Sequence, residues 1–161
     1  MLADTVDHLL HNVLPAAADY EAAEDALSKA YAAGQTPAAW EAVARTAKRR
    51  AAELAVAIDG LTDRCAGELG ISKTAIRKSI AALCFWPGGT SLRMGAHDRV
   101  RGVAGVYKHQ NLSDPTLPIA SEADVLVVGL GYGLDGFGVG KPGGVEVLAQ
   151  ERSGAKWKLP G

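Results

Sequence analysis

Apolar residues recur at three- and four-residue steps over two long stretches of the chain, and this spacing predicts two amphipathic helices. In the first stretch, from Leu2 to Tyr31, the apolar side chains share one helical face. We expect Pro15 to kink this helix or to begin a second segment, because proline has no N–H to donate. The second stretch, from Trp40 to Leu69, keeps its phase through Gly60. Helix is therefore predicted to continue to about Leu69, although glycine costs roughly 1 kcal/mol relative to alanine there.

The residues between these two stretches predict an antiparallel helical hairpin. Gly34 is expected to end the first helix in the left-handed conformation. Thr36 is expected to cap the second helix with its hydroxyl, and Pro37 suits its first position. The link is short, so the two helices must pack antiparallel, and their many alanines allow close approach.

Two shorter helices are predicted to follow. Gly70 ends the long helix and Ser72 caps the next one, whose buried face is expected to hold Ala75, Ile76, Ile80 and Leu83. A further helix is predicted from about His97 to His109, with four inward side chains: Val100, Val103, Ala104 and Tyr107. Glycines are poor helix formers, so Gly102 and Gly105 indicate close contact with a neighbouring helix.

The composition changes after Pro118, where short runs predict strands. Val125 to Val128 is a short apolar run, and Val145 to Ala149 and Ala155 to Leu159 alternate in polarity. We therefore predict an α+β fold: a helical bundle with a long antiparallel hairpin, followed by a small three-stranded antiparallel sheet. We expect one domain over residues 1–161, with a helical part at 1–112 and a glycine-rich β part at 119–161.

Composition limits the function classes. The chain has 161 residues, 48% of them apolar, which is enough for one core. The net charge of −1 excludes a polyanion-binding surface over the whole molecule but leaves a local basic face open. Cys65 and Cys84 lack CxxC spacing, so we expect them to be small buried residues in a reducing compartment. Asp4 and Asp7 stand where an export signal carries positive charge, and no membrane span is visible. We expect a cytoplasmic, bacterial protein.

The sharpest local motif runs from Ala66 to Leu83. Its small residue, turn glycine and spaced aliphatic residues resemble the helix-turn-helix of winged-helix repressors. The resemblance implies DNA binding by Ser72, Lys73, Thr74, Arg77 and Lys78. The helix-turn-helix motif has short helices, so this interpretation requires the long helix to break near Gly60. The apolar stripe is continuous at Gly60, which argues against such a break. The alternative is a capped helix with a solvated basic face.

A second motif is the glycine-rich stretch from Gly129 to Gly144. Gly131, Gly133 and Gly136 fit GxGxxG after a strand, but no helix is predicted to follow and supply the N-terminus that a dinucleotide needs. The simpler interpretation is a connection between strands. The alternative is a small pocket whose backbone amides bind an anion, with three lining side chains: Tyr132, Phe137 and Lys141.

A third motif places Arg101 and His109 late on a predicted helix inside a bundle. This arrangement resembles the HEPN-type RNases, a family of helical proteins in which an arginine and a histidine act on the scissile phosphate. Seven residues separate the pair here, where the family has four to six, and Gly102 replaces the usual asparagine. The resemblance implies RNA cleavage by Arg101 and His109. The alternative is a helix C-terminus at which Lys108 and His109 complement the dipole.

No nucleophile with its base and orienting group is visible, so the leading hypothesis is a non-enzymatic binding or interaction module. We expect it to self-associate or to bind a protein partner, with nucleic acid as the alternative partner and no membrane. His8 and His11 supply only half of a metal site, so we expect no metal and no cofactor.

Overall fold

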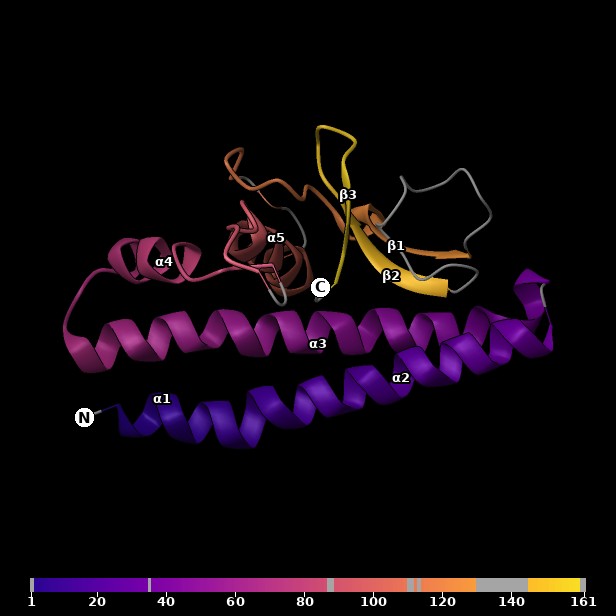
Figure 1. Ribbon diagram of the computed structural model, residues 1–161, viewed down its shortest axis with the longest axis horizontal. Coiled ribbons are helices and arrows are strands. Elements are labelled where there is room, and N and C mark those ends of the chain that lie inside the picture. Colours follow the sequence, from indigo (N-terminus) through magenta and orange to yellow (C-terminus); the bar gives the residue numbers. More distant parts are fainter. Residues whose placement is uncertain are drawn as a thin grey trace.

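The computed structural model describes residues 2–34, 36–86, 89–109, 112, 114–129 and 145–159. It shows two layers (Figure 1). One layer is a long helical hairpin, and the other holds two shorter helices and a small sheet that pack against the hairpin. This architecture confirms the predicted α+β fold class. Within the described residues, no helix combines the length and the apolar character needed to cross a bilayer.

Helix α3, Pro37–Leu69, is the element on which the other elements pack. It is about 50 Å long at 1.5 Å per residue, and it runs through Gly60 without a break, as predicted. Ala47, Ala51 and Leu54 are buried against the rest of the core. Leu69 was expected on the same buried stripe but is 48% exposed, because the helix extends past its neighbours at this end.

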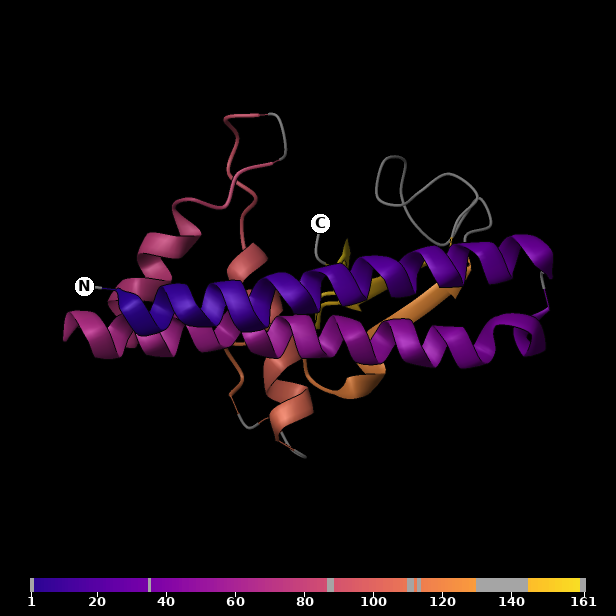
Figure 2. The ribbon, with the colours of Figure 1, turned by 90° about the horizontal axis from the view of Figure 1, so that it is seen from below.

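The first arm of the hairpin consists of three consecutive segments that lie along α3 (Figure 2). These are α1, Ala3–His8, a π-helix at Leu9–Val13, and α2, Leu14–Ala33. The wide π turn lies directly before Pro15, which confirms that the proline begins a new segment. A proline ring collides with the carbonyl four residues earlier, and the wider turn moves that carbonyl away.

The hairpin turn corrects two predictions. Gly34 is extended, with φ −160° and ψ 116°, rather than left-handed. Its missing side chain matters for a different reason, since a Cβ on Gly34 would lie 2.9 Å from the Cβ of Ala39. Thr36 is the N-cap residue of α3, but its hydroxyl makes no capping bond. Its carbonyl instead accepts a hydrogen bond from the Ala39 N–H at 2.9 Å.

Helix α4, Lys73–Ala81, begins as predicted. Gly70 ends α3 in the left-handed region at φ 65°, and the Ser72 hydroxyl accepts the Ala75 N–H at 3.2 Å. Only part of its predicted buried face is buried. Ile76 is 6% exposed, whereas Leu83 lies beyond the end of α4 and is 72% exposed.

Helix α5, Ala96–Lys108, runs across α3 rather than along it. Val103 and Ala104 are fully buried, in agreement with the predicted inward face. The two glycines contact the connector that follows α5, not another helix. A Cβ on Gly102 would lie 2.8 Å from the side chain of Ile119, and one on Gly105 would lie 2.6 Å from that of Leu112.

The sheet follows a short 3-10 helix at Glu122–Asp124 and has the antiparallel order β1-β2-β3. Its strands are β1, Val125–Gly129, β2, Val145–Gln150, and β3, Lys156–Lys158. The alternation predicted for β2 is not seen in its burial, because Val145 to Ala149 are all buried. The carboxylate of Glu146 is fully buried and is compensated by Lys158 on β3 at 3.0 Å.

One hydrophobic core joins the helices and the sheet. Tyr20 and Leu27 of α2 are buried in it, and the Tyr20 hydroxyl donates to the carbonyl of Leu159 just after β3. Cys65 and Cys84, expected to be buried, are half-buried free thiols.

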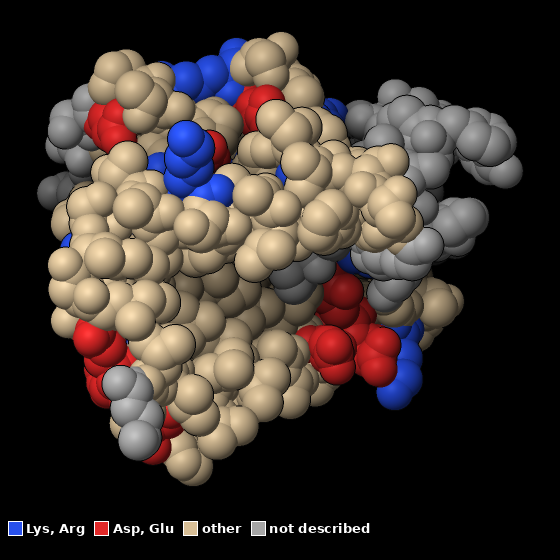
Figure 3. Space-filling model, turned by 60° about the vertical axis from the view of Figure 1, so that its left-hand side comes forward, with Lys and Arg blue, Asp and Glu red and all other residues tan. Residues whose placement is uncertain are grey.

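Large apolar side chains are exposed along the segment that leads from the end of α3 through α4 to the start of α5. Figure 3 views the molecule from the end at which α4 lies, and most of the surface drawn there belongs to neither basic nor acidic residues. Seven exposed large apolar residues from the segment 69–94 define what we term the apolar end: Leu69, Ile71, Leu83, Phe85, Trp86, Leu92 and Met94. Leu83 and Met94 are the most exposed of these, at 72% and 76%.

Candidate functional site

A cavity of about 570 Å³ lies where α3, α4, α5 and the connector after α5 meet. We term it the basic cavity, because four cationic side chains line it. Its lining residues are Asp59, Asp63, Lys73, Arg77, Arg101, Gly105, Lys108, His109, Leu112, Asp114 and Leu117.

Two carboxylates of α3 attach the neighbouring helices on either side of this cavity. Asp59 and Asp63 are four residues apart and therefore share one face of α3. Asp63 pairs with Lys73 of α4 at 2.8 Å, and Asp59 pairs with Lys108 of α5 at 2.9 Å. These ion pairs hold two of the four cations close to the wall of the cavity.

Arg77 is the one lining cation without an ion-pair partner among the described residues. It follows Ile76, whose burial fixes the face that α4 turns toward the core. Among the described residues no carboxylate lies within 4.0 Å of its guanidinium, and its Nε is buried without a hydrogen-bond partner. A guanidinium in this state can hold an oxyanion without first giving up a protein partner.

Arg101 and His109, the two residues of the RNase hypothesis, line this same cavity. The Arg101 guanidinium donates to Asp98 at 3.0 Å, one turn earlier on α5. His109 is the exposed C-cap residue of α5. Both residues of the pair therefore line one cavity, although they are eight positions, or about 12 Å of helical rise, apart along α5.

The charges at the cavity are nearly balanced. Four cations and three carboxylates line it, and Asp98, which is not in the lining, pairs with Arg101. The pKa of Asp114 is lowered mainly by hydrogen bonds from the Thr116 hydroxyl and N–H, and further by the charges of Arg101 and Arg77. The lowered pKa keeps Asp114 ionised, so its carboxylate partly offsets the charges of the two arginines.

The residues of the DNA-binding hypothesis divide into two groups. Lys73 and Arg77 line the basic cavity, whereas Ser72, Thr74 and Lys78 do not. The Ser72 hydroxyl is occupied as the cap of α4. The break near Gly60 that the helix-turn-helix interpretation requires is absent from α3, so this structure offers no pair of short helices at 66–83. DNA binding itself stays a prediction.

The predicted pocket of the glycine-rich stretch lies outside the described residues. This applies to Tyr132, Phe137 and Lys141, and to the glycines of the GxGxxG pattern.

Four charged lining residues were missed as site residues by sequence reasoning: Asp59, Asp63, Lys108 and Asp114. Only the four-residue spacing of Asp59 and Asp63 was a usable signal, since it places both carboxylates on one helical face. The pairing of Asp59 with Lys108 spans 49 positions, and local periodicity carries no information over that distance.

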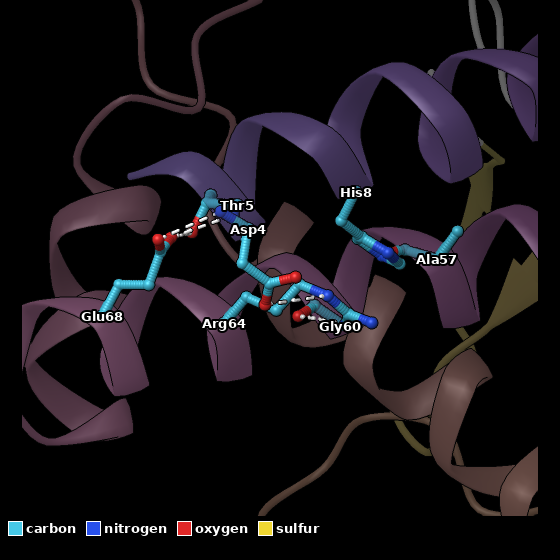
Figure 4. Close-up of polar contacts among 7 residues, drawn as sticks. All are labelled: Asp4, Thr5, His8, Ala57, Gly60, Arg64 and Glu68. Carbon is cyan, nitrogen blue, oxygen red and sulfur yellow. Dashed lines mark hydrogen bonds and ion pairs between the residues drawn. The ribbon is translucent and has the colours of Figure 1, made fainter. Parts of the chain in front are cut away.

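A second polar cluster fixes α1 to α3 (Figure 4). The Glu68 carboxylate accepts the N–H groups of Asp4 and Thr5 at 3.0 and 2.9 Å and the Thr5 hydroxyl at 2.6 Å. The ring of His8 is 8% exposed, and its Nε2 lies 2.9 Å from the carbonyl of Ala57. It packs over Gly60, where a Cβ would be 3.0 Å from Nε2. His11 pairs instead with Asp7 at 3.5 Å.

Within the described residues, no three His, Cys, Asp or Glu side chains lie close enough together to hold a metal ion.

Comparison of the chain with protein-family models, with curated proteins and with solved structures finds no match in any of the three.

Proposed function

We propose that this protein is a binding module whose ligand carries phosphate groups, and that the ligand's phosphate lies in the basic cavity. The observation that supports this is the meeting of Lys73, Arg77, Arg101 and Lys108, from two helices, around one cavity of about 570 Å³. Its size is within the range of small-molecule sites, and guanidinium groups are the donors that best match phosphate oxygens.

Arg77 is the centre of the proposed site. Lys73, Lys108 and Arg101 each have a carboxylate partner, and these partners limit the charge they offer to a ligand. Arg77 has none among the described residues, and its buried Nε lacks an acceptor. The Nη groups of Arg77 are not among the buried atoms and make no hydrogen bond to the described residues, so they are free to donate to a phosphate oxygen.

A titration with inorganic phosphate, followed by NMR of the arginine side chains, tests the proposal. We expect the Nε–H signal of Arg77 to shift with saturation, and added salt to weaken the binding. Arg77→Gln should lower the affinity about ten-fold, since a charge-assisted hydrogen bond contributes about 1.5–3 kcal/mol. Arg45→Gln is the matched control, because Arg45 is exposed and pairs with Glu41 at 2.7 Å. An equal loss in both variants, or no shift at all, would contradict the proposal.

Phosphodiester cleavage is a second candidate, favoured by the presence of Arg101 and His109 in the same cavity. An imidazole at neutral pH can take a proton from an attacking hydroxyl, and an adjacent guanidinium can stabilise the charge on the phosphate in the transition state. We expect RNA cleavage to fall by at least about a hundred-fold in His109→Ala. His11→Ala, an exposed histidine outside the cavity, is the control. Equal cleavage by wild type and His109→Ala would remove this candidate.

Self-association is supported by a separate feature, the apolar end. Soluble monomers rarely expose large contiguous apolar patches, and the segment 69–94 exposes seven large apolar side chains. We propose that a second copy of the chain covers it.

A further inference from the structure

A second cavity, of about 660 Å³, adjoins the basic cavity and shares Asp63 and Lys108 with it. It lies between the N-terminal helical segments, α3 and α5, and it is lined by Asn12 and Tyr107 among others. The Asp59–Lys108 ion pair stands where the two cavities meet. A ligand that reaches from one cavity into the other must therefore pass Lys108.

The charges of this second cavity are all compensated. Its five charged lining residues each have an oppositely charged partner, in the pairs Arg49–Glu53, Arg64–Asp4, Asp63–Lys73 and Lys108–Asp59. We term it the neutral cavity for this reason. It offers no unpaired charge comparable to Arg77, so it suits an uncharged group of the ligand.

The neutral cavity is lined on α3 by small residues. Ala52, Val56, Ala57 and Gly60 recur at three- and four-residue steps or are adjacent, and the buried ring of His8 packs over Gly60 as part of the same lining. Asn12 and Tyr107 are polar residues of the lining. Burial raises the pKa of Tyr107 to about 12, so its hydroxyl keeps its proton near neutral pH and can donate. A lining of small apolar residues with a few polar groups is typical of a site for a small uncharged group.

We propose that the neutral cavity holds a base of a single-stranded nucleic acid whose adjacent phosphate lies in the basic cavity. This inference rests on the function proposed above and assigns the ligand its class. The distribution of charge supports it. The phosphate would lie beside Arg77, which has no ion-pair partner among the described residues, and the uncharged base would lie in the neutral cavity, whose charged residues are all paired. A single strand is required because the bases of a duplex are stacked and paired and cannot enter a cavity.

Oligonucleotides with and without bases distinguish this proposal from phosphate binding alone. The probes are labelled single strands of about ten nucleotides, as RNA and as DNA, each with an abasic strand of the same length and charge. Fluorescence anisotropy measures their affinity for the intact protein. We expect at least one base-bearing strand to bind about ten-fold tighter than its abasic match, because stacking and base contacts are lost without the base. The sugar that gives the larger difference identifies the natural strand.

Two neighbouring substitutions locate the base. Asn12 lines the neutral cavity, whereas His11 is exposed and does not line it. Asn12→Glu and His11→Glu add the same negative charge one residue apart. We expect Asn12→Glu to lower the affinity for the base-bearing strand about ten-fold and His11→Glu to change it about two-fold or less. Equal effects of the two substitutions would overturn the assignment of the neutral cavity.

The outcomes separate the two proposals. If base-bearing and abasic strands bind equally while inorganic phosphate still shifts the Arg77 signal, the base site is overturned and phosphate binding stands. If phosphate causes no shift and no strand binds, both proposals are overturned.

Discussion

At the scale of single residues, Glu68 shows how one side chain can fix an element far away in the sequence. The first N–H groups of a helix have no partner within the helix, and the Glu68 carboxylate accepts two of them in α1 together with the Thr5 hydroxyl. These hydrogen bonds, those from Thr5 first, lower the pKa of Glu68 below its ordinary value of 4.5. The carboxylate therefore stabilises the docking of α1 in its charged form.

We predict that Glu68→Ala weakens the docking of α1 and that the effect depends on pH. A lowered pKa contributes stability that is fully present above the ordinary value of 4.5 and is lost as the pH falls through the folded-state pKa. Amide hydrogen exchange of Asp4 and Thr5 should therefore be faster in Glu68→Ala than in wild type at about pH 6, and the difference should shrink well below about pH 4.

Glu41→Ala is the control for this prediction. Glu41 lies on the same helix and, among the described residues, pairs only with Arg45 on the exposed surface, so its removal should leave the exchange of α1 unchanged. Equal exchange in wild type and Glu68→Ala at about pH 6 would show that the carboxylate does not hold α1.

At the scale of elements, α3 contains two glycines in quite different surroundings. Gly60 lies beneath the ring of His8, and an added Cβ would be 3.0 Å from its Nε2 and 3.2 Å from a guanidinium nitrogen of Arg64. Gly67 has nothing within 4 Å of the position of a Cβ. Glycine at position 60 therefore lets α1 and α3 approach closely, whereas position 67 has no such constraint in the structure.

We predict opposite effects for alanine at these two positions. Gly67→Ala should stabilise the protein by up to about 1 kcal/mol, the gain in helix propensity. Gly60→Ala gains the same propensity but displaces the buried ring of His8, and overpacking costs about 1–3 kcal/mol. We therefore expect a net loss of about 1 kcal/mol in the free energy of unfolding, measured by urea denaturation. Stabilisation by Gly60→Ala would show that His8 moves aside at no cost.

At the scale of the whole molecule, the basic cavity and the apolar end both involve the two layers. The cavity takes side chains from α3, α4 and α5, and the apolar end extends from the end of α3 through the segment after α4. Both features therefore depend on how the second layer packs on α3.

We predict that the purified protein dimerises through the apolar end. Sedimentation velocity should show a dimer that dissociates on dilution, because removal of large apolar surface from water drives association. The double substitution Leu83→Ser with Met94→Ser should shift the equilibrium to monomer. Leu14→Ser, which alters a 52% exposed leucine outside the apolar end, is the control. A monomer at every concentration would contradict the proposal.

The sequence alone determined the elements whose signals are local. Three features are set by residues within one or two helical turns of each other: the unbroken helix from Trp40 to Leu69, its end at Gly70 and the Ser72 cap. All three were predicted correctly. The strand runs after Pro118 and the resulting α+β class depend on equally local patterns.

Only the tertiary structure decided which of these local features meet. Gly34, Gly102 and Gly105 are explained by contacts with Ala39, Ile119 and Leu112, not by the conformations or helix contacts expected for them. Arg77 and Arg101 belonged to two separate hypotheses in the sequence, one for DNA and one for RNA, and the fold places them in one cavity. The physical reason is range: helical periodicity acts over a few residues, whereas the approach of α4 and α5 across α3 is set by packing of the whole core.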